Sequence, residues 1–511
     1  MLVRKDTNFL SEISTFFKKN DSDRAMFTIM NVIKGVKMNE RTLFGRTSKC
    51  NCVYSLLQVF QFLFICPCFM IRNPFNVMGS SLGGRLGCGK DVFYEFLNDA
   101  RTDWRKLMYH ITSQLWTKIK LRSDHKANDT CLIIDDTDFP KTGKRIENIG
   151  RVHSHLAHKS ILGFKGLFLG ITDGVTQMLL DFAILGEKGK KGNYGMSARE
   201  LSNRYSIERE AGSALETRIG EYSISKIDLT IEMIKRAILH KVKFRYVLAD
   251  SWFTCAKIIK YIRGRHIKCD YLGMIKIGDD SRTKYHFERK NLNAPAIIKA
   301  LEKRGKKKYS RKFKCWYMSA DVIFADTPVR LFFVRRSKRG PWSGLLCTDL
   351  RLGFFEAYKI YSRRWSLEVI FKESKGLLGL GKCQSSNFAA QIASTSLVAL
   401  QYNVLSVVKR FEAYETIGEL FREATQDSLE ITISERILGA ILELVDAIAK
   451  VFNITDEDVL EAVVNQSDEL IIENADYVLA IWDGVSRGTH NAIGHAQNLS
   501  KPLLVERFDN K

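Results

Sequence analysis

The chain has 511 residues, 45% of them hydrophobic, which is enough for about two to four domains with cores of their own. This composition excludes collagen-like, disordered and small disulfide-stabilised proteins. The 79 Lys and Arg residues exceed the 57 Asp and Glu residues, which gives a net charge of +22. Because residues 411–511 hold only 7 basic but 20 acidic residues, the positive charge is concentrated in residues 1–410. Such a positive field attracts polyanions. It indicates nucleic acid as the favoured partner, with an acidic membrane surface as the second choice.

Cysteine usage and the first residues indicate the compartment. The 11 cysteines are an odd number, and the opening MLVRKDTNFLSE is charged, without an apolar secretory segment. These features predict a protein of the reducing cytosol. The stretch from Cys52 to Ile71 is nearly apolar and long enough to cross a bilayer. However, Gln58, Gln61 and Pro67 favour a buried helix that ends at the proline, and a membrane span is the less favoured alternative.

The apolar pattern changes character along the chain. Residues 1–125 have helical spacing, which predicts a helical N-terminal domain. Strands and helices then alternate, which is typical of an α/β sheet with covered faces. The expected strands are Cys131–Ile134, Ile161–Ile171, Met178–Leu185, Phe244–Leu248 and Tyr271–Ile277, and the expected helices are Ser225–His240 and Phe253–Ile262. Residues 280–350 interrupt this alternation with the strand-like runs Trp316–Met318 and Val329–Val334, and residues 356–450 are again helical.

The most informative segment is YSRRWSLEVIFKESK, from Tyr361 to Lys375. Tyr361, Arg364, Glu368 and Lys375 are 3, 4 and 7 residues apart, which predicts that they share one stripe of a helix. Trp365 and Lys372 join this face. Arg364 and Glu368 alone could be an ordinary exposed ion pair. The added Tyr, Trp and Lys residues favour a phosphate-contacting surface around one carboxylate.

A single carboxylate does not hold a hard divalent cation, because Mg²⁺ takes several oxygen ligands. Asp136, in CLIIDDTDFP, and Asp250, in YVLADSWF, both follow apolar strands. Ligand sites of α/β sheets lie outside such strand ends. The alternative is that these acids cap helices or form turns. Asp135 and Asp138 beside Asp136 are interpreted as supporting or capping groups rather than ligands.

These motifs together resemble the bacterial insertion-sequence transposases with an Asp-Asp-Glu triad and a Tyr-x2-Arg-x3-Glu-x6-Lys signature, the IS-four-like group. Tyr361, Arg364, Glu368 and Lys375 match the full signature. Asp136 precedes a threonine as the family's first acid does, and Asp250 opens its D-x-W/Y-F motif. The resemblance covers residues 30 to 460, and the choice of Asp136 over Asp135 depends on the family's alignment.

The resemblance implies an RNase H-like α/β catalytic core with a β-rich insertion and a helical N-terminal DNA-binding domain. The expected boundaries are 1–125 for the N-terminal domain, 126–279 and 351–466 for the two parts of the core, 280–350 for the basic insertion and 467–511 for a tail. Asp136, Asp250 and Glu368 would hold two Mg²⁺ ions, which Mn²⁺ can replace, for attack on DNA phosphodiesters by water and then by a 3′-hydroxyl.

By the same resemblance, the protein would bind double-stranded DNA, namely the inverted repeats of its element and the target DNA, as a homodimer. It would be a bacterial protein of the cytoplasm, associated with the nucleoid and not with a membrane. The signature side chains would contact phosphates beside the cleaved end. The run KRGKKKYSRKFK, from Lys303 to Lys314, predicts further backbone contacts, with solvated surface as the alternative. The residues expected to bind DNA are Tyr361, Arg364, Lys372, Lys375, Lys306, Lys307, Lys308, Arg311 and Lys312. Trp316 or Trp342 is a candidate for stacking on a displaced base, with packing in a strand as the favoured alternative.

Other motifs are less persuasive. The P-loop-like GRLGCGK, Gly84 to Lys90, is followed by Asp91 instead of Ser or Thr, which argues against nucleotide binding. The His153, His155 and His158 set and the Cys50, Cys52, Cys66 and Cys68 set lack zinc spacing. The tail, with ADYVLAIWDGVSRGTH, resembles a strand–helix–strand fragment of SLOG-type Rossmann-like proteins, and we expect it to be dispensable.

The sequence therefore predicts a DNA transposase that cuts and rejoins DNA at inverted repeats. Two alternatives remain open. One is a structure-selective RNase H-like nuclease that hydrolyses without joining, and the other is a DNA-binding protein with an inactive triad. The repeat sequence, the target preference and the cleavage intermediate do not follow from the residues.

Overall fold

The computed structural model describes residues 25–49, 53–69, 89–122, 130–155, 157–209, 212–264, 267–278, 282–412, 414–426, 478–482 and 487–507. The chain divides into two compact units, Met1–Leu429 and Glu430–Lys511. Gly84–Cys88, Cys50, Cys52 and the helical region expected over residues 427–450 lie outside the described residues.

The described residues of the N-terminal part of the first unit form helices. Its elements are α2 (Ala25–Lys34), α3 (Glu40–Phe44), α4 (Leu56–Ile65), η1 (Cys66–Phe69), α6 (Asp91–Asn98) and α7 (Trp104–Arg122). Ser55 and Gln58 form a capping box at the start of α4, and the helix ends two residues before Pro67. Its residues from Gln58 to Ile65 are buried, which confirms a buried helix here. No helix among the described residues combines the length and apolarity that a membrane crossing needs.

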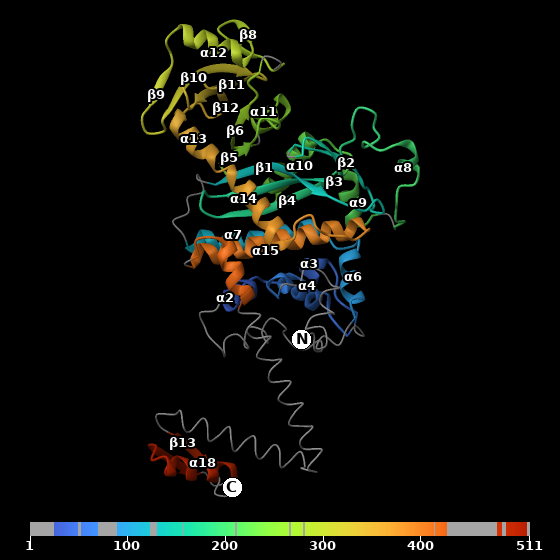
Figure 1. Ribbon diagram of the computed structural model, residues 1–511, viewed down its shortest axis with the longest axis vertical. Helices are drawn as coiled ribbons and strands as arrows, with labels where there is room; N and C mark the ends of the chain where they lie inside the picture. The colour runs from blue at the N-terminus through green and yellow to red at the C-terminus, as the bar shows by residue number, and fades with distance from the viewer. Residues whose placement is uncertain are drawn as a thin grey trace. The chain divides into compact units, whose positions relative to one another are not determined.

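A twisted sheet forms the core of the first unit (Figure 1). Its core strands are β1 (Cys131–Pro140), β2 (Gly150–Ser154), β3 (Lys159–Thr172), β4 (Gln177–Leu185), β5 (Tyr246–Ala249) and β6 (Asp270–Ile275). β3 is antiparallel to both β1 and β4, whereas β5 is parallel to both β1 and β6. The resulting order β4-β3-β1-β5-β6 is the RNase H-like arrangement that the sequence predicted. All five predicted core strands are confirmed, and the short β2, whose GRVHS sequence has only one strongly apolar residue, was not predicted.

Helices pack against these strands. They are α9 (Ala214–Glu221), α10 (Lys226–Leu239), α11 (Ala256–Ile262) and α15 (Phe388–Phe411), together with α7, whereas the short α8 (Ala198–Ser202) buries none of its residues. α10 and α11 confirm the predicted helices, although α11 begins three residues later than expected because residues 251–253 form a turn. α7 and α15 lie side by side beneath the sheet in Figure 1.

A side chain of α15 covers backbone groups of strand β4. The Asn403 side-chain oxygen accepts a hydrogen bond from the Leu179 N–H at 2.8 Å, and its amide nitrogen donates to the Leu179 carbonyl at 2.8 Å. The buried amide therefore satisfies the same two groups that a neighbouring strand would.

A buried ionic cluster joins β4 to three helices. Asp181 of β4 is 1% exposed and accepts hydrogen bonds from Arg105 of α7 at 2.8 Å and Arg236 of α10 at 2.7 Å. Arg218 of α9 lies 3.8 Å from the same carboxylate, and Arg105 also pairs with Glu221 at 2.8 Å. Burial opposes ionisation of Asp181, but the three arginines outweigh it and lower the pKa.

The insertion continues the core sheet. Its elements are β7 (Tyr285–Phe287), β8 (Lys290–Leu292), α12 (Ala294–Lys303), β9 (Lys308–Ser310), β10 (Cys315–Phe324), β11 (Thr327–Arg335) and β12 (Ser343–Cys347). β12 pairs antiparallel with β6, so the hydrogen-bonded ladder runs without a break from the core into the insertion. The β-rich character of this region is confirmed. Helix α12, capped by Asn293, was not predicted.

The single helix expected from Tyr361 to Lys375 is wrong. α13 (Phe354–Ser362) ends before Arg363, α14 (Trp365–Glu373) follows, and a π-helical turn covers Ser374–Leu378. The helix is interrupted at Arg363 and Arg364, between Tyr361 and Glu368, and Lys375 lies in the π-helical turn. A π-helical turn is a feature often found at functional sites.

Within the second unit, β13 (Val478–Trp482) pairs in parallel with β14 (Leu503–Arg507), and α18 (Arg487–Asn498) connects them. This is the strand–helix–strand order expected for the tail. Residues 483–486, between β13 and α18, lie outside the described part.

We predict that Asp181→Ala destabilises the first unit by about 3 to 5 kcal/mol, because it leaves buried arginine charges without their shared partner. Urea unfolding monitored by far-UV circular dichroism measures this change. The matched control is Glu232→Ala, which removes an exposed ion pair with Lys235 and should cost less than about 1 kcal/mol. Equal destabilisation in both variants would contradict the central role of Asp181.

Candidate active site

Two acids meet at the ends of neighbouring strands. β1 and β5 run parallel with Ile134 opposite Ala249, so the next residues, Asp135 and Asp250, lie at the same level of the sheet. The negative charge of Asp250 acts on Asp135, which agrees with this proximity. The Asp250 carboxylate accepts a hydrogen bond from the Trp252 N–H at 2.8 Å, which fixes its orientation at the start of the turn.

Arg364 brings a third acid to the same place. One guanidinium nitrogen of Arg364 donates to Asp135 at 2.8 Å, and the other donates to Glu368 one turn along α14. Arg364 therefore joins Asp135 to Glu368, and Asp250 lies beside Asp135 at the end of the neighbouring strand.

The predicted first acid, Asp136, faces away from this group. Successive side chains of a strand point to opposite faces, and Asp136 pairs with Lys226 at 2.8 Å, with Lys165 3.9 Å away. Asp138 lies on the same face and binds Lys165. The structure thus places Asp135 beside both Asp250 and Arg364, and Arg364 beside Glu368, whereas Asp136, the predicted first acid, lies on the other face of β1. The period-two alternation of a strand indicates from the sequence that the two acids lie on opposite faces, but not which face meets Arg364.

The protonation of Asp135 reflects its environment. Burial raises the pKa of Asp135 to about 7, the positive charge of Arg364 opposes the shift, and Asp250 and Asp136 reinforce it. Burial also disfavours the charge of Arg364, but Tyr361, Asp135 and Glu368 raise its pKa above the ordinary value. A carboxyl group whose pKa is shifted in this way by burial and by neighbouring charges is typical of a functional site.

The other signature residues complete the surroundings. The Lys375 ammonium, at the π-helical turn, donates to the Thr137 hydroxyl at 2.7 Å and to the Asp138 carbonyl at 3.0 Å. Burial lowers the pKa of Lys375. Burial likewise raises the pKa of Tyr361 well above its usual range. Lys372 is exposed and lies outside these contacts.

The donor set suits a hard divalent cation, because carboxylate oxygens are the ligands that Mg²⁺ and Mn²⁺ prefer. Among the described residues, no three His, Cys, Asp or Glu side chains already stand in an arrangement that encloses a metal ion. Arg364 separates Asp135 from Glu368. The residues therefore fit a cation if the guanidinium moves out from between them.

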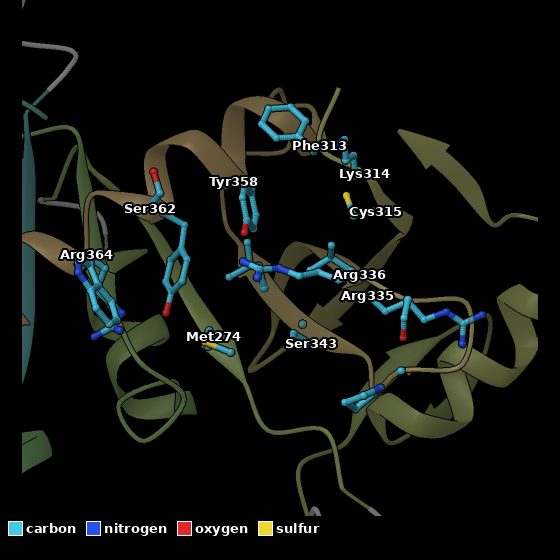
Figure 2. A pocket seen from close by; sticks show the side chains of 18 residues that line it. Met274, Phe313, Lys314, Cys315, Arg335, Arg336, Ser343, Tyr358, Ser362 and Arg364 are labelled. Carbon is cyan, nitrogen blue, oxygen red and sulfur yellow. The ribbon is translucent and has the colours of Figure 1, made fainter. Parts of the chain in front are cut away.

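A cavity of about 960 Å³ adjoins the acids (Figure 2). Tyr361, Arg364 and Trp365 form one wall, and the insertion contributes Arg335 and Arg336. Figure 2 shows Arg336 pointing toward Tyr358 across the cavity from Arg364. The mixture of aromatic rings and cations is suited to unpaired nucleotides.

The basic run of the insertion lies on β9 and the turn that follows it. The residues predicted to bind DNA, Lys306, Lys307, Lys308, Arg311 and Lys312, do not line the cavity, although Lys314 at the end of the run does.

The tryptophans differ in accessibility. Trp316 packs against Tyr309, with ring centroids 4.9 Å apart, and Trp342 lies under the Arg335 guanidinium at 4.3 Å. Trp365 is 61% exposed and lines the cavity, so it is better placed for stacking than either predicted candidate.

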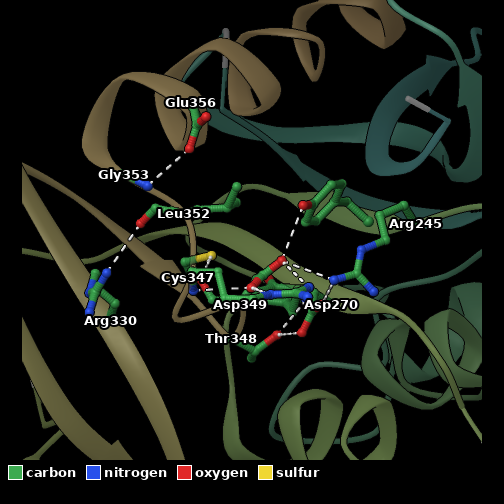
Figure 3. Close-up of polar contacts among 12 residues, drawn as sticks. Arg245, Asp270, Arg330, Cys347, Thr348, Asp349, Leu352, Gly353 and Glu356 are labelled. Carbon is green, nitrogen blue, oxygen red and sulfur yellow. Dashed lines mark hydrogen bonds and ion pairs between the residues drawn. The ribbon is translucent and has the colours of Figure 1, made fainter. Parts of the chain in front are cut away.

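A polar network fixes the junction between core and insertion (Figure 3). Arg245 beside β5 lies 2.8 Å from Asp270 of β6 and 2.9 Å from Asp349 after β12. Arg351 binds Asp349 at 2.9 Å, and Thr348 donates to Asp270 at 2.9 Å. Shortly after this network, Gly353 and Glu356 begin α13, the helix that carries Tyr361. The network therefore positions the signature residues relative to the strand that precedes Asp250.

Part of the chain matches a known protein family. Residues 76–269 match the family model described as DDE superfamily endonuclease, which includes Asp135, Asp136 and Asp250 but less than half of the chain. A solved structure described as a piggyBac transposase synaptic complex with hairpin DNA has 12% sequence identity and a TM-score of 0.41, over 81% of this chain and 78% of that chain. This similarity is too low to assign a shared fold. A comparison with curated protein sequences finds no match.

We predict that acid destabilises the junction through Asp349. Hydrogen bonds from Arg351 outweigh burial and lower the pKa of Asp349 below its ordinary value of about 3.9. A depressed carboxyl pKa contributes stability above the unfolded-state pKa, and this stability is lost as the pH falls from about 4 toward the folded-state pKa. Thermal melts between about pH 6 and 2.5 should show a shallower decline for Asp349→Asn than for the wild-type protein. Parallel declines would contradict this role.

Proposed function

We propose that the protein is a DNA transposase that cuts and rejoins DNA at the inverted repeats of its own element. The observation that carries the proposal is that Asp135 and Asp250 follow two parallel neighbouring strands and that Arg364 joins Asp135 to Glu368 of α14. The family match over residues 76–269 supports an endonuclease of the Asp-Asp-Glu type. The excess of basic residues in residues 1–410 supports a polyanionic substrate.

In this proposal, Asp135, Asp250 and Glu368 hold Mg²⁺, and Asp136 positions Lys226 on the opposite face of β1. When bound, the metal polarises the scissile phosphodiester and lowers the pKa of attacking water or of a DNA 3′-hydroxyl. Arg364 and Lys375 neutralise phosphate charge beside the acids, and the half-buried Tyr361 restricts where the DNA strand lies.

The large cavity accepts the terminal nucleotides of the element, and Trp365 offers an exposed ring for stacking. The exposed cations around β9 contact the backbone of the same DNA. A homodimer would hold two ends together, and the N-terminal helices would recognise the repeats.

A nuclease that hydrolyses DNA without joining is the second candidate, because the matched family is described as an endonuclease. A labelled DNA fragment that carries the sequence flanking the gene distinguishes the two. Joined products support transposition, whereas cut ends without joining support the nuclease.

We predict that Asp135→Asn, Asp250→Asn and Glu368→Gln each reduce cleavage of this fragment by at least about a thousandfold, because each removes a metal-holding carboxylate. Retention of the fragment in a gel-shift assay should be nearly unchanged. Asp136→Asn is the matched neighbour, and its cleavage should fall by no more than about tenfold. If Asp136→Asn is inactive while Asp135→Asn still cuts, the assignment on β1 must be reversed.

We also predict that chelation by EDTA abolishes cleavage and that added Mg²⁺ or Mn²⁺ restores it. Metal that binds only the folded protein raises the melting temperature. A rise with Mg²⁺ in the wild-type protein and none in Glu368→Gln would locate the ion at these acids. The same rise in both proteins would place the binding elsewhere.

A further inference from the structure

A second cavity, of about 280 Å³, opens on the core outside the acidic site. The turn between β3 and β4 forms one wall, with Thr176 and Gln177. The last turn of α15 forms another, with Lys409 and Arg410, and Tyr414 and Ile417 from the segment after α15 close it. We call this cavity the α15 pocket.

The charge of the α15 pocket is positive. Arg410 lies 3.8 Å from Asp173, and Lys409 forms no ion pair with any residue that the structure describes. Cations are common in the last turn of a helix, where they complement the helix dipole. Two cations alone therefore do not identify a ligand.

Thr176 provides the independent observation. Its side chain is 3% exposed, and its hydroxyl oxygen has no hydrogen-bond partner among the described residues. The turn holds it firmly, because the Thr172 hydroxyl donates to the Thr176 carbonyl at 2.8 Å and Asp173 accepts from the Thr176 N–H at 2.7 Å. A buried hydroxyl group without a hydrogen-bond partner costs folding free energy. Because the turn fixes Thr176 in this position, we infer that its hydroxyl donates to a bound acceptor.

The same turn extends toward the acidic site. A Cβ added to Gly174 would lie 3.0 Å from the Arg363 side chain, so Arg363, the residue before Arg364, packs against the turn. Gln177 donates to the Tyr402 hydroxyl at 3.2 Å, which donates to Glu373 of α14 at 2.7 Å. Polar contacts thus connect the α15 pocket with the helix that carries Glu368.

We propose that the α15 pocket binds a backbone phosphate of the DNA whose neighbouring segment occupies the acidic site. Lys409 and Arg410 supply the charge and Thr176 donates its hydroxyl to a phosphate oxygen. The proposal rests on the proposed function, because it takes DNA as the substrate. It adds a contact that fixes the DNA at a distance from the reacting phosphodiester.

The test measures the affinity of the full chain for DNA as a function of salt, in an Asp250→Asn background that does not cut. Lys409→Gln/Arg410→Gln should weaken binding about tenfold near physiological salt and reduce the slope of log K against log[salt] by about 0.9 for each phosphate that the variant no longer neutralises. Lys106→Gln/Lys243→Gln removes the same charge from two exposed lysines outside the pocket and should leave the slope unchanged.

Thr176→Val tests the hydroxyl separately. It should weaken DNA binding about three- to tenfold without changing the salt slope, because it removes a neutral donor but no charge. Thermal melts check that each variant remains folded. A double variant that melts normally and binds with the wild-type slope would overturn the proposal, as would an equal weakening in the control pair.

Two further measurements separate the possible outcomes. If inorganic phosphate raises the melting temperature through Lys409 and Arg410 while the DNA slope is unchanged, the pocket takes free phosphate, which overturns the DNA assignment. Cleavage by the chain without the Asp250→Asn change is scored independently. If that chain does not cut DNA, but its binding to DNA still depends on the α15 pocket, the proposed function fails and the phosphate contact stands.

Discussion

The bridge that Arg364 makes between Asp135 and Glu368 determines the geometry of the site. Strand pairing alone places Asp135 beside Asp250, because β1 and β5 are parallel neighbours. Glu368 comes from a distant part of the chain and is held in this group by a guanidinium that binds both carboxylates. Three acids of like charge repel one another in a partly buried place, so their proximity requires a compensating cation. In the protein without metal, Arg364 is that cation.

This arrangement relates metal binding to DNA binding. A metal ion between Asp135 and Glu368 would compete with the guanidinium for the same oxygens. A DNA phosphate offers Arg364 an alternative partner of comparable strength, since arginine forms bidentate contacts with phosphate as it does with carboxylate. The cavity beside Arg364 is where such a phosphate would approach. Substrate and metal would then enter the site together.

Much of the core could be predicted from the sequence because its signals are local. The apolar runs of β1, β3 and β4 and the amphipathic spacing of α10 each specify one element, and all four are confirmed. Glu368 and Asp250 were identified from motif spacing. Three features depend on the assembled structure instead. The break between α13 and α14 was not indicated by the helical spacing of Tyr361 and Arg364. The choice between Asp135 and Asp136 depends on which face of β1 is turned toward Arg364. The α15 pocket combines residues more than 200 positions apart in the sequence.

The uninterrupted ladder from β6 to β12 has a mechanical consequence. A domain attached through a loose linker swings freely, but an insertion joined by strand pairing and by the Arg245 network is a rigid extension of the core. The distance between the basic surface and the acids is then constant, so a DNA duplex bound at both, as proposed, would have to adapt its own shape. Sequences that deform easily would be favoured at positions the protein never touches, and the energetic cost of distortion would contribute to the choice of DNA.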